Sequence, residues 1–295
     1  MVEVLEAVAA THHRTIRATG FPSRVSVGFL KQQLDRCRVL PSLETPRLFF
    51  VLDSSLELPG LDYPLVRFLT PLKPLQKSDL QVFVSSLAAH APRHLAIVAS
   101  YLSASCSFVR SIAPSPTYYD NVKLLCDVRR IRPAVRVLPA NTRVRSFRTG
   151  QDEDNYVKAY NDFLGYLGSK IARPFIEGLE KRGSFNPEGY LFAESAGRTI
   201  GFVSLENEPQ GTRDSKFAYI YQIGVASDYR GTGVADVLLD RVITFAQAAG
   251  IERVGVGVRR SNQTAIKFFK RRGFEAKYSV VGHVVDVQNP TKSLT

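Results

Sequence analysis

The second half of the chain alternates between two patterns of apolar residues, one typical of strands and one typical of helices. Residues 143–148 place polar and apolar side chains in turn, as a strand with one buried face does. Residues 152–164 follow with acidic residues first, which favours a helix because acids stabilise a helix N-terminus. The same reasoning predicts a helix at 171–181, hairpin strands at 190–194 and 199–206, a strand at 216–225, a helix at 233–249, a strand at 252–258, a short helix at 262–272 and closing strand residues at 274–287.

The first half is less regular. Apolar runs at 48–52, 65–69 and 95–98 predict buried strands, while residues 27–38 and 79–91 predict helices. We therefore expect a mixed α/β domain here.

Residues 128–141 carry two prolines and four arginines without an amphipathic period, which indicates a junction. The predicted organisation is two domains, 1–140 and 141–295.

Composition narrows the class of protein. The chain has 295 residues, 44% hydrophobic and 22% charged, as expected for a globular protein of about two domains. No apolar stretch is long enough to span a bilayer, and the N-terminus lacks the pattern of a secretory signal, so we expect a cytoplasmic protein. Cys37, Cys106 and Cys126 show no metal-ligand spacing, which predicts buried reduced thiols and neither a disulfide framework nor a metal site.

Charge and glycine content point to an anionic partner. The formal charge is +12, which favours nucleic acids, phosphorylated metabolites or acidic membranes without choosing among them. Only three of the 20 glycines precede residue 141, and a loop that cradles phosphate needs glycines so that its backbone amides can approach the anion. A phosphate site is therefore expected in the second half.

The most informative segment is Ile220–Ala235, which leads into the predicted helix at 233–249. Its small residues Gly231, Thr232 and Gly233 leave backbone N–H groups unpaired at the positive end of the helix dipole, where a pyrophosphate can bind. A plain tight turn is the alternative. The segment is not a Walker loop, because no lysine followed by serine or threonine comes after the glycines, and it lacks the third glycine of the dinucleotide fingerprint.

Two motifs in order carry a resemblance to a known family. Arg230, Gly233 and Ala235 fit the central motif of the GNAT acetyltransferase superfamily, and a second motif follows in which Asn262 opens a short helix that ends in Gly273 and Phe274. The resemblance covers about residues 143–280. It implies an α/β fold with a mixed central sheet flanked by helices. The layout is similar to tandem GNAT proteins such as mycothiol synthase, with two tandem domains of which the first is degenerate.

The resemblance also implies acetyl-CoA as cosubstrate. The residues that it assigns to acetyl-CoA are Ile223, Gly224 and Val225 on the central strand, Arg230, Gly231, Thr232, Gly233, Val234 and Ala235 around the helix start, and Asn262 and Phe269 in the second motif. Asn262 is also expected to cap its helix. The basic residues Arg259, Arg260, Lys270, Arg271 and Arg272 either meet the 3′-phosphate of coenzyme A or are simply solvated.

The expected reaction is direct attack of a primary amine on the acetyl thioester. The backbone N–H near Val225 is the implied donor to the oxyanion. The tyrosine that commonly protonates the thiolate is replaced by Phe269, which leaves Tyr278 or solvent for that role. For the base we favour Glu206, with a surface position as the alternative, and Tyr219 and Tyr221 either bind the acceptor and relay its proton or pack in the sheet.

The acceptor is a small-molecule amine or a peptide, and no membrane partner is expected. Two other functions remain open: a sensor that binds coenzyme A or acyl-CoA without turnover, and nucleic-acid binding through the arginines of residues 129–148, which we consider less favoured.

Overall fold

The structure, a computed structural model, describes residues 2–17, 31, 37–40, 48–53, 65–71, 82, 85, 94–100, 117–132, 138–164, 170–181, 185–207 and 216–286. The chain divides into two compact units. The first comprises residues 1–123, 258–266 and 276–295, and the second comprises residues 124–257 and 267–275.

The second unit is built on a mixed sheet with the strand order β5-β10-β9-β8-β7-β6. β10 runs parallel to β9, whereas β6, β7, β8 and β9 are joined in antiparallel pairs. The bounds are β5 (Thr117–Asp127), β6 (Thr142–Ser146), β7 (Tyr190–Ser195), β8 (Arg198–Asn207), β9 (Phe217–Val225) and β10 (Arg253–Arg259). The strands predicted in this half are confirmed, with shifts of one or two residues at their ends.

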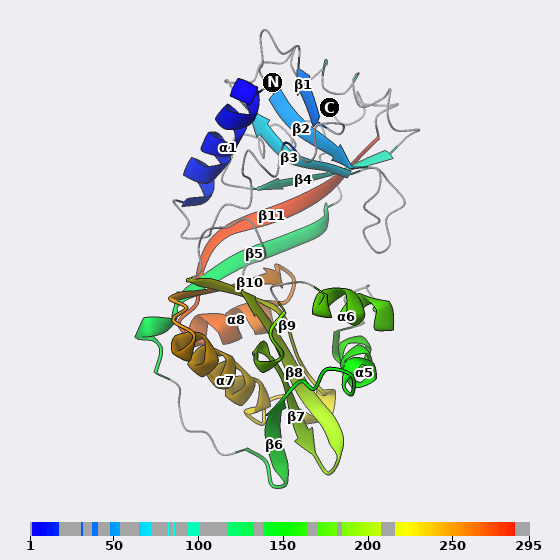
Figure 1. Cartoon of the computed structure of the whole chain (residues 1–295), viewed down its shortest axis with the longest axis vertical. Helices are drawn as coiled ribbons and strands as arrows, with labels where there is room; N and C mark the ends of the chain where they lie inside the picture. The colour runs from blue at the N-terminus through cyan, green and yellow to red at the C-terminus, as the bar shows by residue number, and fades with distance from the viewer. Residues whose placement is uncertain are drawn as a thin grey trace. The chain divides into compact units, whose positions relative to one another are not determined.

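Helices cover both faces of this sheet. Figure 1 shows α5 (Glu153–Leu164) and α6 (Arg173–Glu180) beside one face and α7 (Val234–Ala248) beside the other. All six residues of β7 are buried, as expected for a strand covered on both sides. The short helix α8 (Gln263–Arg271) follows β10, and the predicted helices of this half are all present.

An aromatic core fills the α5 side of the sheet. Its buried rings come from α5 and from strands or loops that are distant in sequence, namely Phe147, Tyr156, Phe163, Tyr190, Phe192 and Phe202. On the opposite face, α7 buries the apolar stripe predicted from its spacing, including Val234, Leu238 and Val242. Burial of these side chains is the main force that holds the helices on the sheet.

The first unit contains α1 (Val2–Arg17) and the strand order β1-β2-β3-β4-β11-β5. Its remaining strands are β1 (Cys37–Leu40), β2 (Leu48–Asp53), β3 (Leu65–Pro71), β4 (His94–Ser100) and β11 (Glu275–Asp286). The three strands predicted from apolar runs are confirmed as β2, β3 and β4. The predicted helices at 27–38 and 79–91 lie almost wholly outside the described residues. The prediction that the first of these helices continues to residue 38 is wrong, because Cys37 and Arg38 belong to β1.

The residues that make up the two compact units differ from those of the two domains predicted from the sequence. The first boundary falls between residues 123 and 124, and residues 258–266 and 276–295 return to the first unit. The division at 140/141 stays a prediction.

Cys126 is a buried free thiol, and burial raises its pKa to about 12. In the described part of the chain, no helix has both the length and the apolar character that crossing a membrane requires.

Candidate active site

The central feature of the site is the point where β9 and β10 stop pairing. The parallel ladder ends at Ile220↔Val256, although β9 continues to Val225 and stays paired with β8. Among the described residues, the β9–β10 ladder therefore does not extend to the last four residues of β9, 222–225. The predicted residues Ile223, Gly224 and Val225 all lie in this part of β9.

A β-bulge explains why the strands part. Ser204 pairs with Gln222 and the next residue, Leu205, pairs with Ile220, so Tyr221 is an extra residue in β9. Bulges bend a strand and increase its local twist. Because the bulge lies directly after the last β9–β10 pair, it turns the end of β9 away from β10. The peptide groups on that edge of β9 are then available to a ligand.

The phosphate loop, which we define as Arg230–Ala235, joins β9 to α7. Gly231 and Gly233 have φ values of +82° and +89°, a conformation that favours glycine. A Cβ atom added at either glycine would meet nothing within 4 Å, so the surface of the loop is open. In the described part of the chain, the N–H groups of Gly231, Gly233, Val234 and Ala235 have no hydrogen-bond partner.

These open N–H groups stand at the start of a helix of 15 residues. The dipole of the helix places partial positive charge at this end. An anion that contacts the loop would accept hydrogen bonds that the protein leaves unmade. The loop therefore fits a phosphate group in both charge and shape.

Short contacts hold the loop in place. Thr232 Oγ1 donates to the carbonyl oxygen of Tyr229 at 2.7 Å, and Arg230 Nε donates to the carbonyl oxygen of Val225 at 3.3 Å. Asp228 lies in the turn that precedes the loop and forms an ion pair of 3.0 Å with Arg198 at the start of β8. The loop is thus linked to the end of β9, where the backbone edge is open.

Glu206, the predicted base, lies at the end of β8 and is 3% exposed. The surface position considered as an alternative is therefore wrong. Its Oε1 accepts a hydrogen bond of 2.6 Å from the Tyr190 hydroxyl, while Oε2 is buried and has no partner among the described residues. Tyr219 lies directly opposite Glu206 in the β8–β9 ladder. The rings of Tyr219 and Tyr221 are in edge-to-face contact at 5.0 Å.

Sequence reasoning missed the residues around Glu206. They form a buried polar cluster, which we define as Tyr156, Tyr190, Ser204, Glu206 and Gln222. Tyr156 donates to Gln222 Oε1 at 3.0 Å, and Ser204 donates to the same oxygen. A glutamine within the apolar run of β9 is the one signal in the sequence that could have revealed this cluster.

The residues of the second motif have clear local roles. Asn262 caps α8, because its Oδ1 accepts a hydrogen bond of 3.0 Å from the N–H of Ala265. It belongs to the first compact unit, so its bond to the pantetheine arm stays a prediction. Phe269 is 1% exposed and packs edge-to-face against Phe274 at 5.1 Å between ring centroids. Phe269 is therefore part of the core of the second unit.

The basic residues that were predicted either to meet the 3′-phosphate or to be solvated do not act as one surface. Arg272 is nearly buried and forms ion pairs with Asp240 and Asp236 of α7. The expectation that Arg272 is solvated is wrong, because these carboxylates hold it against α7, while contact of Arg272 with the 3′-phosphate stays a prediction. Arg260 is bound by Asp120 at 2.9 Å.

A cavity of about 730 Å³ lies beside α5. Side chains of α5, the turn between β7 and β8, and the residues after β9 line it: Asp152, Asn155, Lys158, Ala159, Asp162, Phe163, Glu194, Gly197, Arg198, Thr199, Ala226 and Ser227. These elements are far apart in sequence, so no local pattern could predict the cavity.

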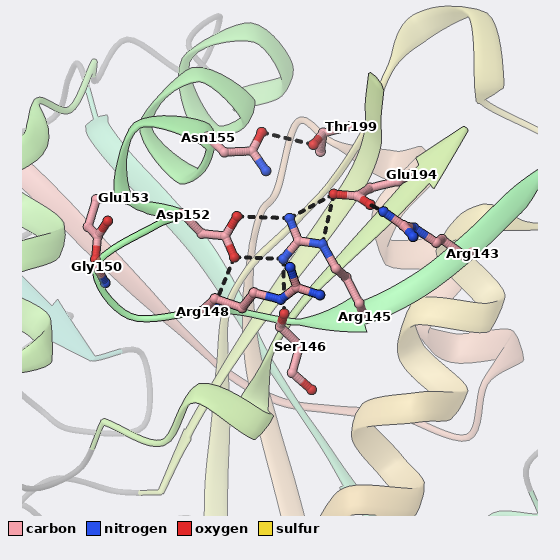
Figure 2. A network of polar contacts seen from close by, with 10 residues as sticks. All are labelled: Arg143, Arg145, Ser146, Arg148, Gly150, Asp152, Glu153, Asn155, Glu194 and Thr199. Carbon is pink, nitrogen blue, oxygen red and sulfur yellow. Dashed lines mark hydrogen bonds and ion pairs between the residues drawn. The ribbon is translucent and has the colours of Figure 1, made fainter. Parts of the chain in front are cut away.

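Two carboxylates that line this cavity, Asp152 and Glu194, belong to an arginine network. Figure 2 shows the Arg145 guanidinium between the carboxylates of Asp152 and Glu194, with Arg143 on the far side of Glu194. Burial alone would raise the pKa of Asp152, but the hydrogen bonds from Arg145 and from the N–H of Arg148 outweigh it and lower the pKa. Arg129 is likewise paired with Asp127 and Glu252. The charges of these arginines are thus neutralised within the unit.

The geometry agrees with comparisons to known proteins. Residues 148–274 match the model of the acetyltransferase (GNAT) family. The chain is 35% identical over 130 residues to an uncharacterized N-acetyltransferase of Methanocaldococcus jannaschii, covering 43% of this chain and 56% of that protein. It is 28% identical over 142 residues to the mycothiol acetyltransferase of Thermobispora bispora, covering 46% and 48%. The chain therefore spans about half the length of the curated relatives that it matches.

Two solved structures are similar to the chain in fold. A GCN5-related N-acetyltransferase from Sphaerobacter thermophilus is similar with a TM-score of 0.74 and 16% identity, covering 97% of this chain and 94% of that one. A tandem GNAT protein from the clavulanic acid biosynthesis pathway gives a TM-score of 0.67 at 13% identity, with coverage of 97% and 95%. The resemblance noted in the sequence is confirmed, and residues 148–274 form an acetyltransferase domain of the GNAT family.

Proposed function

We propose that this protein is an N-acetyltransferase that transfers the acetyl group of acetyl-CoA to a primary amine by direct attack. The observation that carries the proposal is the set of open N–H groups in the phosphate loop, directly after the part of β9 to which the β9–β10 ladder does not extend. A pyrophosphate on the loop would place the rest of the cosubstrate along the open edge of β9. The family match at residues 148–274 supports this assignment.

The end of β9 would hold the reacting carbonyl group. Bound acetyl-CoA supplies a thioester, whose carbonyl carbon is the electrophile. The backbone N–H near Val225 would donate to the carbonyl oxygen as negative charge develops there. Gly224 keeps this segment close to α5, because a Cβ at this position would lie 2.9 Å from the Phe202 ring and 3.0 Å from Phe163.

Glu206 would receive the proton of the acceptor amine. An amine attacks only when its nitrogen lone pair is free, so an ammonium must first lose a proton to a base. Oε2 of Glu206 is a buried acceptor without a partner in the described residues, as a site for that proton requires. Tyr219 and Tyr221 would line the approach of the amine beside this carboxylate.

We further propose a tandem arrangement in which residues 1–140 are a degenerate GNAT-like domain and residues 141–295 are the acetyl-CoA-binding domain. Only three of the 20 glycines lie before residue 141, which supports loss of the phosphate loop from the first domain. The likeness to a tandem GNAT structure over 97% of the chain also supports it.

The first test is calorimetric titration with acetyl-CoA of the wild type and of Gly233→Asp. Aspartate places a negative charge among the N–H groups that would bind pyrophosphate, so we expect affinity to fall about 100-fold or more. Gly250→Asp is the matched control. Gly250 follows the other end of α7, has a φ of +71° and also has open space around its Cβ position. Equal affinities of Gly233→Asp and the control would contradict the phosphate assignment.

Release of coenzyme A thiol with a panel of primary amines then separates an enzyme from a sensor. Turnover with any amine above the rate of hydrolysis supports the transferase. Tight binding of acetyl-CoA without thiol release from any amine would contradict it.

A further inference from the structure

Tyr190 stands in an unusual position beside the proposed base. It is the first residue of β7, is 1% exposed, and lies next to Ser204 in the β7–β8 ladder. Glu206 is two residues beyond Ser204, on the same face of the sheet. The Tyr190 hydroxyl therefore reaches along this face and donates to Glu206 Oε1 at 2.6 Å.

The surroundings of Tyr190 keep its hydroxyl protonated. The rings of Phe147, Tyr156 and Phe185 pack against it with centroids 4.7 to 6.1 Å away. Burial in this apolar wall, followed by the negative charge of Glu206, raises the pKa of Tyr190 far above its ordinary value of 10.0. Tyr190 is thus a permanent hydrogen-bond donor over the physiological pH range.

The hydrogen bond leaves the two oxygens of Glu206 in different states. Oε1 is occupied by Tyr190, while Oε2 has no partner in the described part of the chain. Among the described residues, the titratable groups near Glu206 are tyrosines: Tyr190 from β7, Tyr156 from α5, and Tyr219 and Tyr221 from β9. Within the described residues, Glu206 forms no ion pair. In the described part of the chain, the hydrogen bond that Glu206 accepts from a side chain comes from the Tyr190 hydroxyl.

We propose that Tyr190 is a positioning residue for the acetyl transfer, which fixes the Glu206 side chain through Oε1 and leaves Oε2 for the acceptor. This inference rests on the proposed function. In the step that it supports, an N–H bond of the acceptor ammonium breaks, an O–H bond to Oε2 forms, and the electron pair stays on nitrogen. The Tyr190 proton does not move, and the sequence alone assigned Tyr190 no role.

The test compares pH profiles of kcat/KM for the wild type and Tyr190→Phe with acetyl-CoA and the best primary amine. Without the hydroxyl, the carboxylate loses the donor that stabilises its charge and takes up a proton at higher pH. We expect the acidic limb to move to higher pH and kcat/KM on that limb to fall about ten-fold. The affinity for acetyl-CoA should not change, because Tyr190 is not part of the phosphate loop.

Tyr160→Phe is the matched control. Tyr160 is partly buried and packs against the aromatic core, where its ring is 6.5 Å from Phe202, and it has no assigned role in the reaction. Its pH profile should match the wild type. An unmoved acidic limb in Tyr190→Phe, or an equal movement in both variants, would overturn the proposal.

Two further measurements keep the test decisive. If Tyr190→Phe does not fold, replacing Tyr190 by 3-fluorotyrosine retains the ring and strengthens the donor, so the acidic limb should move to lower pH. A carbon-13 titration of the Glu206 carboxyl in labelled protein needs no turnover. If no amine is acetylated, the transferase proposal fails, while a titration that moves to higher pH in Tyr190→Phe still supports the role of Tyr190.

Discussion

At the scale of single residues, buried carboxylates in the second unit are each held by particular donors. Asp152 is 5% exposed and accepts two hydrogen bonds from Arg145, at 2.6 and 2.8 Å, and one from the N–H of Arg148. Glu206 has one donor and one open oxygen. The satisfied carboxylate serves stability, and the half-satisfied one is the better candidate for chemistry.

Asp152→Asn should lower the free energy of unfolding by about 2 kcal/mol at pH 7. The substitution removes the carboxylate that pairs with Arg145, and both side chains of this pair are nearly buried. The pKa of Asp152 is lowered in the folded protein, so its stabilising effect is present above the ordinary value of 3.8 and is lost as pH falls through the lowered value. The difference between variant and wild type should therefore shrink in strong acid. Urea unfolding at several pH values measures both effects.

Asp162→Asn provides the control for this experiment. Asp162 also lies on α5 and pairs with Lys158 at 2.8 Å, but the two side chains are 51% and 75% exposed. An exposed pair contributes about 0.5 kcal/mol or less. Equal losses in both variants would show that burial of the Arg145 network is unimportant.

At the scale of elements, glycines set where helices begin and end. Gly233 begins α7 and leaves its amides open, whereas Gly273 follows α8 in a crowded place. Gly273 has a φ of +83°, and an added Cβ would lie 2.5 Å from Ile131 Cδ1. The first glycine has a surface that a ligand can reach, and the second permits close packing.

Gly273→Ala should destabilise the protein more than Gly150→Ala. Gly150 has a similar φ of +79° but nothing within 4 Å of its Cβ position. We expect a loss of about 1 kcal/mol for Gly150→Ala from backbone strain alone, and at least about 1 kcal/mol more for Gly273→Ala from the clash. Thermal unfolding of the two variants measures the difference. Equal melting temperatures would mean that Ile131 yields without cost.

At the scale of the whole molecule, the compact units do not follow the order of the chain. Residues 280–286 of β11 pair with β4 in the first unit, and residues 124–127 of β5 lie in the second unit. A cut at the predicted boundary of 140/141 therefore removes β4 from β11 and β5 from β10. Both changes expose strand edges that are paired in the whole chain.

A fragment of residues 141–295 should thus associate, although it contains both GNAT motifs. Size-exclusion chromatography with light scattering on the fragment and on the whole chain at equal concentration measures this. We expect species larger than one chain for the fragment, because unpaired strand edges form intermolecular ladders. A monomeric fragment with cooperative unfolding would contradict the prediction.

The sequence by itself determined the helices and strands of residues 142–286 and the glycine turn at Arg230–Ala235 that begins α7. Periodicity of apolar residues reports which face of a helix or strand is buried, and the glycines of the loop act through local backbone geometry. These features depend on neighbours in the chain, so they can be read from it. The strands β2, β3 and β4 of the first half were also predicted from their apolar runs.

Only the tertiary structure decided the surroundings of Glu206, the bulge at Tyr221, the burial of Arg272 and the membership of the two units. Each depends on residues that are distant in the chain, such as Tyr190 with Glu206 or Arg272 with Asp240. A glutamate at the end of a predicted strand has the same local pattern whether water or a tyrosine hydroxyl faces it. The environment that turns this carboxylate into a candidate base comes from the packing of α5, β7, β8 and β9, and local sequence patterns do not encode that packing.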